Sequence, residues 1–257
     1  MNFGNEFHDK RVVITGAAGI MGKALVKAFL DSGAQVCLTD QNIDTLSIAN
    51  ENGFVVEADL TKDEGLQKLL NEVKAKWGAP DVVINNAAIY PSSFLLDMSV
   101  ADWDQIMSVN VRAPFVLMRG FCLQMIDAGV RGNVINISSG AARKMRRTAV
   151  TYCMSKTALD RMTKGFALEM AEFGIRVNIL EPGFATGSTV SALTQEHVDR
   201  VMAAIPLGIQ TAAEDVGQSA LFLASNAAKN ITGTSLAVDG GNSAGTMDVF
   251  QDKKHPL

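Results

Sequence analysis

The sequence of 257 residues contains few of the side chains that most often build metal centres and imidazole-based catalytic sites. It has only three cysteines and three histidines, and the histidines stand far apart, at His8, His197 and His255. Neither a metal site nor a histidine-based catalytic triad is therefore expected. The cysteines show no CxxC spacing, and their odd number suits a reducing compartment.

Long apolar runs and strong charge of one sign are also missing. No run of about 18 apolar residues occurs, so the sequence predicts no membrane-spanning segment. The N-terminus, MNFGNEFHDKRVVITG, carries charges ahead of any apolar run and does not resemble a secretory signal. We therefore expect a cytoplasmic protein. The net charge of −4 disfavours a general nucleic-acid binder.

What the chain does have is a regular alternation of apolar β-branched segments with helical patterns. Strands are expected at 11–16, 35–40, 54–59, 81–88, 133–139, 176–183 and 235–241. Helices are expected at 20–32, 42–51, 63–77, 100–128, 149–173, 194–204 and 213–225. This order predicts an α/β protein with a doubly wound parallel sheet of about seven strands and helices on both faces, the Rossmann fold.

The chain shows no linker, low-complexity segment or repeat, so residues 1–257 are interpreted as a single domain. Residues 184–204 interrupt the alternation of strands and helices. They are poor in strand signal and begin with a stretch rich in serine, threonine and alanine. We expect this segment to form a lid over a substrate site.

The first predicted strand leads into a glycine-rich turn, TGAAGIMG (15–22), and then a helix. Its glycines, Gly16, Gly19 and Gly22, would allow a tight turn, close approach of a pyrophosphate and close helix packing. The free N–H groups of the helix N-terminus favour an anion. Such a turn alone is a weak signal, because many strand–helix turns bind no ligand.

Two acidic residues end the second and third predicted strands. Asp40 lies where an acid can bind the adenosine ribose hydroxyls, and its charge would repel a 2′-phosphate. Since no lysine or arginine occurs between Gly16 and Gly22 or just after Asp40, the sequence favours NAD over NADP. Asp59 could bind the adenine amine. For both acids a plain solvent-exposed turn residue is the alternative.

The chain has only two tyrosines, and one of them, Tyr152, precedes Lys156 by one helical turn. Both side chains then project from the same helix face. The pair could be apolar packing beside an extended lysine. It could also be a phenol whose pKa is lowered by a neighbouring positive charge.

Together these segments resemble the classical short-chain dehydrogenase/reductase family over about residues 10–243. The resemblance rests on TGAAGIMG, Asp59-Leu60, NNAA (85–88), Asn110, Ser139, YCMSK (152–156), EPG (181–183) and VDGG (238–241), in family order. Two departures stand out. The glycines follow the TGxxGxxG spacing of extended family members, and Thr186 stands one place early in the motif after EPG, with Ser188 following.

The resemblance implies a catalytic role for Asn110, Ser139, Tyr152 and Lys156. Tyr152 would be the general acid/base, and Lys156 with an oxidised nicotinamide would lower its pKa. Ser139 would hold the substrate oxygen, and Asn110 would anchor a water in a proton relay. The cofactor-binding residues implied or indicated by position are Gly16, Gly19, Ile20, Met21, Asp40, Asp59, Leu60, Asn86, Ala87, Tyr152, Lys156, Pro182, Gly183 and Thr186.

Between Ser139 and Tyr152 the chain carries an unusual number of cations, with Arg143, Lys144 and two further arginines. The resemblance places this segment on the substrate side of the cleft. Arg143 and Lys144 could bind a carboxylate, phosphate or sulfonate, or simply form a solvated loop or salt bridges at a subunit contact. Tyr90 and Phe184 are further candidates beside the substrate, with apolar packing as the alternative.

Three functions remain open at this level. The first is an NAD-dependent oxidoreductase that oxidises a secondary alcohol of a small polar or anionic molecule, such as a sugar or sugar acid. The second is an NADPH-dependent reductase of the 3-oxoacyl-carrier-protein type, which Asp40 disfavours. The third is a non-catalytic dinucleotide sensor. The family resemblance also implies a homotetramer, or a dimer, formed through helices near 100–128 and 150–173.

Overall fold

The computed structural model describes residues 3–46, 52–185 and 194–247. Seven strands form one parallel sheet, in the order β3-β2-β1-β4-β5-β6-β7. The strands are β1 (Arg11–Thr15), β2 (Gln35–Asp40), β3 (Gly53–Glu57), β4 (Val82–Asn85), β5 (Asn133–Ile137), β6 (Arg176–Pro182) and β7 (Ser235–Val238). The predicted doubly wound parallel sheet is confirmed.

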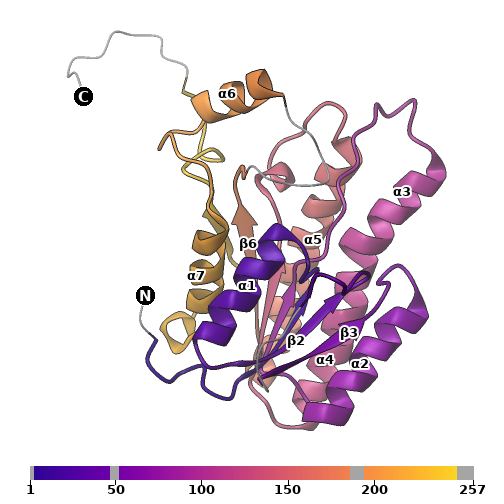
Figure 1. The fold of residues 1–257 in the computed structure, drawn as a ribbon, viewed down its shortest axis with the longest axis vertical. Coiled ribbons are helices and arrows are strands. Elements are labelled where there is room, and N and C mark those ends of the chain that lie inside the picture. The colour runs from indigo at the N-terminus through magenta and orange to yellow at the C-terminus, as the bar shows by residue number, and fades with distance from the viewer. Residues whose placement is uncertain (1–2, 47–51, 186–193, 248–257) are drawn as a thin grey trace.

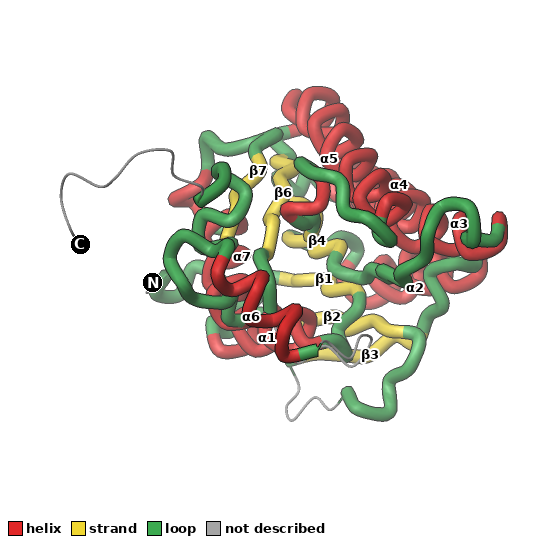
Figure 2. The backbone as a smooth tube through the Cα atoms, turned by 90° about the horizontal axis from the view of Figure 1, so that it is seen from above, coloured by secondary structure: helices red, strands yellow, loops and turns green. Residues whose placement is uncertain are grey.

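Helices cover both faces of this sheet (Figures 1 and 2). The principal helices are α1 (Ile20–Asp31), α2 (Asp63–Trp77), α3 (Val100–Met107), α4 (Ala113–Asp127), α5 (Val150–Met170), α6 (Gln195–Ala203) and α7 (Ala213–Ala224). Helices α1 and α7 pack together on one face, and α2, α4 and α5 lie on the other. In Figure 1, α6 lies at the end of the molecule toward which the arrow of β6 points.

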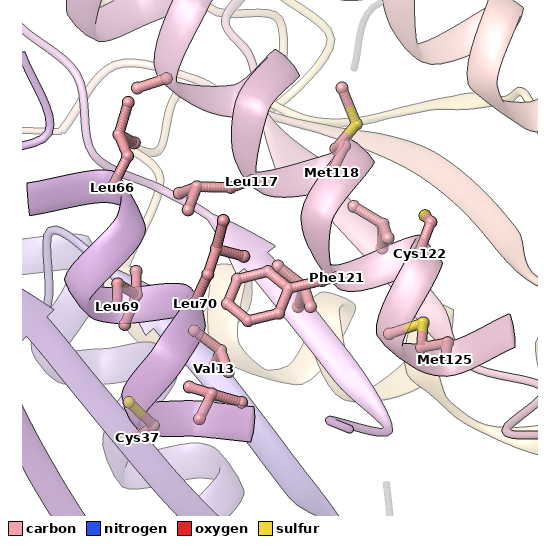
Figure 3. Close-up of a cluster of buried hydrophobic side chains, with 14 of the residues drawn as sticks. Val13, Cys37, Leu66, Leu69, Leu70, Leu117, Met118, Phe121, Cys122 and Met125 are labelled. Atoms are coloured by element: carbon pink, nitrogen blue, oxygen red, sulfur yellow. The ribbon is translucent and has the colours of Figure 1, made fainter. Parts of the chain in front are cut away.

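Alternation along the central strand explains this three-layer arrangement. In β1, Val12 and Ile14 face the core under α1 and α7, while Val13 faces the core under α2 and α4. Because successive strand residues point to opposite faces, a strand that is apolar at every position buries both of its faces. Figure 3 shows Val13 with Leu70 and Phe121 in the second of these cores.

The helix expected at 42–51 is wrong over the residues that the structure describes. Residues 42–46 form a turn, in which the side chain of Asn42 accepts a hydrogen bond from the N–H of Asp44 at 2.9 Å. Asparagine side chains stabilise turns in this way and so compete with helix formation. Residues 47–51 lie outside the described residues.

The long helix expected at 100–128 forms, but it is not regular. A π-helical segment, Ser108–Arg112, separates α3 from α4 and contains Asn110. Such segments are rare and often occur at functional sites. Several strands also end earlier than expected: β4 ends at Asn85, β5 at Ile137 and β7 at Val238. The residues that follow them leave the sheet at its carboxyl edge.

The helical run Val100–Asp127 is long and apolar enough to cross a membrane by length and composition alone, with a mean hydropathy of 1.3. Its inner side carries Leu117, Met118 and Phe121, which are fully buried against α2 and the sheet. A core helix of a folded domain satisfies the same criterion. The run is therefore only weak evidence for a membrane segment.

Candidate active site

A cleft of about 400 Å³ lies at the carboxyl edge of the sheet. It opens above β1 and β4, which are neighbours in the sheet although the chain winds outward from them in opposite directions. This switch point is where doubly wound sheets usually bind ligands. All of the predicted cofactor-binding residues that the structure describes line the cleft, and Thr186 lies outside the described residues.

Steric contacts explain two of the three glycines in the turn between β1 and α1. Gly16 has φ +64°, and a Cβ atom there would lie 2.8 Å from Ala87 Cα. A Cβ on Gly22 would lie 2.1 Å from the carbonyl oxygen of Gly16. Gly19 is different, because a Cβ there would meet nothing closer than the Gly16 oxygen at 3.5 Å. The protein's own packing therefore does not require a glycine at position 19.

Hydrogen bonds from two strands fix this turn. The carboxylate of Asp40, at the end of β2, accepts from the N–H of Ala18 at 3.0 Å. Just after β4, the side chain of Asn86 donates to the carbonyls of Thr15 and Gly16 at 2.9 and 3.0 Å. Asp40 and Asn86 thus hold the shape of the turn as well as lining the cleft.

Asp59 and Leu60 form the next part of the wall. Asp59 Oδ1 accepts from the N–H and the hydroxyl of Thr61, at 2.9 and 2.7 Å. These bonds, led by that of the hydroxyl, lower the pKa of Asp59. Leu60 is buried and lines the same wall. Asp59 is therefore an ionised acid at the rim, already engaged in part by its own turn.

Ser139 and Tyr152 meet in the other half of the cleft. Their hydroxyl groups share a hydrogen bond. Ser139 follows β5, and its Oγ also accepts from the N–H of Ala141 at 3.2 Å. Tyr152 lies in the first turn of α5, where its ring packs edge-on against Tyr90 with 5.9 Å between the centroids.

Lys156 lies one turn beyond Tyr152 and is almost fully buried. Its ammonium donates to the carbonyl of Ile137 at 2.8 Å and lies 5.8 Å from the centre of the Tyr152 ring. Burial lowers the pKa of Lys156 to about 8, which the charge of Asp160 opposes. Tyr152 and Lys156, the first and last residues of YCMSK, thus face the same cleft, as their spacing predicts.

Asn110 is fully buried behind the cleft and does not line it. Its side chain exchanges two hydrogen bonds with the backbone of Ile89, both at 2.9 Å, and donates to Ser155 Oγ at 3.0 Å. Ser155 in turn donates to the carbonyl of Tyr152 at 2.7 Å. Asn110 therefore links the end of β4 to the first turn of α5.

The prediction that Lys156 and an oxidised nicotinamide together lower the pKa of Tyr152 concerns the cofactor complex; in the protein by itself that pKa is raised. Burial raises the pKa of Tyr152 and outweighs the opposing effects of the Ser139 hydrogen bond and the Arg146 charge. The guanidinium of Arg146 lies 6.0 Å from the centre of the Tyr152 ring. Arg146, rather than Arg143 or Lys144, is thus the cation of this segment that acts on the phenol.

Arg143 and Lys144 both have partners inside the protein. Arg143 Nη2 lies 2.8 Å from a carboxylate oxygen of Glu181, whose side chain is only 1% exposed. Lys144 reaches the carbonyl and the side-chain oxygen of Asn242, at 3.4 and 3.5 Å. This placement does not favour the prediction that the two cations are available to a substrate anion. A buried carboxylate competes for Arg143.

Of the remaining predicted residues, some line the cleft and one lies outside its lining. Tyr90, Pro182 and Gly183 line the cleft. A Cβ on Gly183 would lie 2.5 Å from Thr211 Oγ1, so this position requires glycine. Phe184 is not part of the wall, and its carbonyl accepts from the N–H of Thr211 at 2.8 Å.

Some residues of the site were not predicted. Gln41, Thr61 and Val109 line the cleft, and their only signal is their position beside predicted residues. Two acids, the half-buried Asp160 and the buried Glu181, interact with the cations around the site. Nothing in the local sequence distinguishes these acids from ordinary surface carboxylates. The described residues contain no group of three His, Cys, Asp or Glu side chains that could hold a metal ion.

The cleft fits a nicotinamide dinucleotide. The first N–H groups of α1, which have no partner within the helix, belong to residues that line it, as a pyrophosphate would require. Asp40 stands where a ribose would lie, and small or apolar residues, including Ala87 and Ile137, form the walls for flat rings. Fold and site together define a dinucleotide-binding oxidoreductase.

Comparisons with known proteins agree with the assignment to the dinucleotide-binding oxidoreductases. A family model described as enoyl-(acyl carrier protein) reductase matches residues 16–243. Glucose 1-dehydrogenase 2 of Bacillus subtilis is 34% identical over 90% of this chain and 94% of its own. The 3-oxoacyl-[acyl-carrier-protein] reductase FabG of Rickettsia typhi is 31% identical over 92% of this chain and 98% of its own.

Two solved structures share the fold closely. A short-chain dehydrogenase from Leptospira borgpetersenii with bound NAD⁺ has a TM-score of 0.88 at 25% identity, covering 95% of this chain and 96% of its own. A Beutenbergia cavernae protein described as a gluconate 5-dehydrogenase, with bound NADP, has a TM-score of 0.88 at 31% identity, covering 94% and 100%. The chain belongs to the short-chain dehydrogenase/reductase family.

Proposed function

We propose that the protein is an NAD-dependent dehydrogenase that oxidises a secondary alcohol of a small polar molecule, such as a sugar or sugar acid, and reduces the ketone in reverse. One observation carries the proposal. The hydrogen-bonded hydroxyls of Ser139 and Tyr152 stand beside Lys156 in the same cleft as Asp40. The polyol and sugar enzymes among its relatives support the substrate class.

In this mechanism Ser139 donates a hydrogen bond to the substrate oxygen and Tyr152 removes its proton. A bound oxidised nicotinamide supplies the hydride acceptor and a positive charge near the phenol. Since burial raises the pKa of Tyr152 in the protein alone, the phenolate needs additional positive charge. Lys156 and Arg146 are the nearest cations that the chain itself provides.

Asn110 has a second group to offer besides its side chain. Its side-chain hydrogen bonds are used by Ile89 and Ser155. Its backbone carbonyl lies within the π-helical segment Ser108–Arg112, whose hydrogen bonds depart from the regular α-helical pattern. We propose that this carbonyl anchors the water that returns protons toward Lys156. The π-helical segment that contains Asn110 provides the irregular backbone for this role.

Asp40 supports NAD as the cofactor. It lines the cleft at the end of β2, and its charge would lie beside a 2′-phosphate. Its neighbour in the wall is Gln41, which carries no charge to offset the repulsion. The solved relatives bind either NAD⁺ or NADP, so the carboxylate of this chain is the basis for the choice.

The test is a comparison of NAD⁺ and NADP⁺ reduction over a panel of sugars, polyols and sugar acids. We expect turnover with NAD⁺ and at least one polyhydroxylated substrate. Equal or better turnover with NADP⁺ would contradict the assignment of the cofactor, and no turnover with any alcohol would contradict the substrate class.

A reductase of the 3-oxoacyl-carrier-protein type is the second candidate. It is favoured by the relationship to the FabG enzyme and by the exposed cations Arg146, which lies beside Tyr152, and Arg147, which suit an acidic carrier. NADPH oxidation with an acetoacetyl thioester separates the two functions. Activity that is faster with NADPH and a thioester than with NAD⁺ and a sugar would favour this candidate.

We also propose that the protein forms a homotetramer through α4 and α5. Large apolar side chains are exposed on both helices, with Phe115 and Leu123 on α4 and Met154 and Leu168 on α5. Leu168 is 80% exposed, which a solvated helix surface does not need. Light scattering is expected to give four times the 27.4 kDa of one chain. A monomer mass would overturn this assignment.

A further inference from the structure

Glu181 is a buried carboxylate that the proposed mechanism does not use. It lies near the end of β6, and its side chain is 1% exposed. Apart from the Arg143 guanidinium at 2.8 Å, neither carboxylate oxygen has a hydrogen-bond donor among the described residues. A buried charge of this kind is costly unless it is paired. The ion pair with Arg143 therefore offsets the cost of burying the Glu181 carboxylate.

The segment around Ser139 is fastened to α5 on two sides of the serine. Ser138 donates to Asp160 Oδ1 at 2.6 Å, and Thr157 donates to the carbonyl of Ala142 at 2.9 Å. Both partners on α5 lie beyond Tyr152 in the helix. These two hydrogen bonds fix where residues 138–142 lie along α5. They do not fix the residues that follow Ala142, called here the outer end of the segment.

The outer end is held by Arg143, four residues after Ser139. Its ion pair with Glu181 ties the segment to β6. Burial tends to raise the pKa of Asp239, beyond β7, but hydrogen bonds from Ser243 and Gly241 lower it, and the charge of Arg143 adds a smaller lowering effect. Arg143 is therefore a partly exposed cation, 45% exposed in its side chain, that interacts with carboxylates at the ends of β6 and β7.

The same guanidinium acts on the environment of the catalytic lysine. Burial raises the pKa of Asp160, and the hydrogen bond from Ser138 opposes this, followed by smaller effects of the charges of Lys156, Lys164 and Arg143. Asp160 in turn supports the charged form of Lys156. Removing Arg143 would thus weaken the ionised state of Asp160 and, through it, that of Lys156.

We propose that Arg143 is a positioning residue for catalysis, which acts through Glu181 to hold Ser139 in hydrogen-bonding contact with Tyr152. On this proposal Arg143 does not bind a substrate anion. The kinetic part of the inference rests on the dehydrogenase function proposed above. The structural part does not, because the contact between Ser139 and Tyr152 exists in the protein alone.

The first experiment follows the ionisation of Tyr152 directly. The chain has only two tyrosines, so in a Tyr90→Phe background the absorbance of the phenolate reports Tyr152 alone. Ser139 lowers the pKa of Tyr152, and Arg146 and Lys156 remain in every variant. We expect R143M to move the titration midpoint upward, because the Ser139 hydrogen bond is weakened.

The matched control is R131M. Arg131 is an exposed arginine just before β5, at the opposite edge of the sheet. The R131M variant should leave the titration midpoint of Tyr152 unchanged. The R143K variant keeps the charge and should show a smaller upward shift of this midpoint than R143M. A midpoint that is the same in R143M and in the parent would overturn the proposal.

The second experiment measures NAD⁺ reduction with glucose and with gluconate, a neutral and an anionic substrate. A positioning role predicts that R143M lowers kcat for both by about tenfold to a hundredfold, with little change in KM. The effects of R143M and E181Q should be strongly non-additive in the double variant, because both act on one contact.

A different set of results would show that Arg143 binds the substrate directly. If R143M raises KM for gluconate alone, while E181Q leaves or improves it and the two effects add, Arg143 binds the anion and the proposal fails. If the parent enzyme oxidises neither sugar, the proposed function fails instead. The Tyr152 titration and thermal unfolding of the single and double variants then still decide whether Arg143 acts through Glu181.

Discussion

The nucleotide half of the cleft, from the glycine turn to Leu60, and the catalytic half, from Ser138 to Lys156, hold their residues in different ways. The nucleotide half depends mainly on backbone shape. Gly16 and Gly22 leave no room for a Cβ, and Asp40 and Asn86 bind the backbone of the turn. Its constraints are mainly steric, although Ala87, Asn86 and Asp40, which impose them, come from other strand ends.

The catalytic half depends on buried polar side chains that come from distant elements. Lys156 is fixed by the carbonyl of Ile137, and Asn110 by the backbone of Ile89. Arg143 is held by Glu181, which is 38 residues away in the chain. Substitutions in the nucleotide half should therefore act mainly through steric clashes with the backbone. Substitutions in the catalytic half should act mainly by changing charges and proton positions.

The largest effect is expected from removing the phenol itself. Tyr152→Phe keeps the ring and its packing but removes the proton acceptor, so kcat should fall by about 10²–10⁴. NAD⁺ affinity, measured by isothermal titration, should change little. Tyr90→Phe is the control, because it removes the hydroxyl of the neighbouring ring. If Tyr152→Phe keeps full activity, the enzyme does not use this site, and a non-catalytic or different role must be considered.

The steric nature of the nucleotide half is tested by a pair of glycine variants. Gly22→Ala places a Cβ 2.1 Å from the Gly16 oxygen, whereas the Cβ of Gly19→Ala meets nothing closer than 3.5 Å. We expect Gly22→Ala to lower the free energy of unfolding by about 1–3 kcal/mol in urea titrations. Gly19→Ala should leave it nearly unchanged. Equal losses in the two variants would show that the turn does not have the packing described above.

The charge of Asp40 should determine the preference for NAD⁺ over NADP⁺, although the rest of the nucleotide half is constrained mainly by steric contacts. Asp40→Asn keeps an oxygen that can accept from Ala18 N–H but removes the repulsion toward a 2′-phosphate. The KM for NADP⁺ should fall by about tenfold, equivalent to about 1.4 kcal/mol, while the KM for NAD⁺ rises. Asp44→Asn, in the exposed turn that follows, is the control. An unchanged ratio of NAD⁺ to NADP⁺ efficiency would contradict the role of the carboxylate.

The smallest effect is a dependence of stability on pH that the buried ammonium predicts. Burial lowers the pKa of Lys156 from 10.5 to about 8. Above pH 8 the folded state has lost this proton while the unfolded state keeps it until about pH 10.5, so the contribution of Lys156 to stability rises with pH in this window. Between pH 8 and 9 the gain is about 1 kcal/mol.

Urea titrations at pH 8 and pH 9 measure this gain against two variants. Lys156→Met should lack it, because no ammonium remains to titrate. Lys74→Met removes an exposed lysine from α2 and should retain it. The same gain in all three proteins would mean that another group is responsible.

Much of this architecture could be predicted from local patterns. Alternating strands and helices gave the sheet, and the spacing of Tyr152 and Lys156 placed both on one face of α5. The helix expected after β2 failed because the side chain of Asn42 stabilises a turn instead. The roles of Arg143 and Lys144 could not be predicted, because Glu181 and Asn242, their partners, are distant in sequence.

Local sequence patterns fix which backbone can form: apolar strands that must be buried on both faces, and glycines where a turn leaves no space for a side chain. Where the charges act depends instead on tertiary packing. It turned Arg143 toward a buried carboxylate, placed Arg146 beside Tyr152, and raised the pKa of the phenol by removing it from water. Chain packing is local enough to be read from spacing, whereas electrostatic effects depend on burial and on partners that only folding brings together.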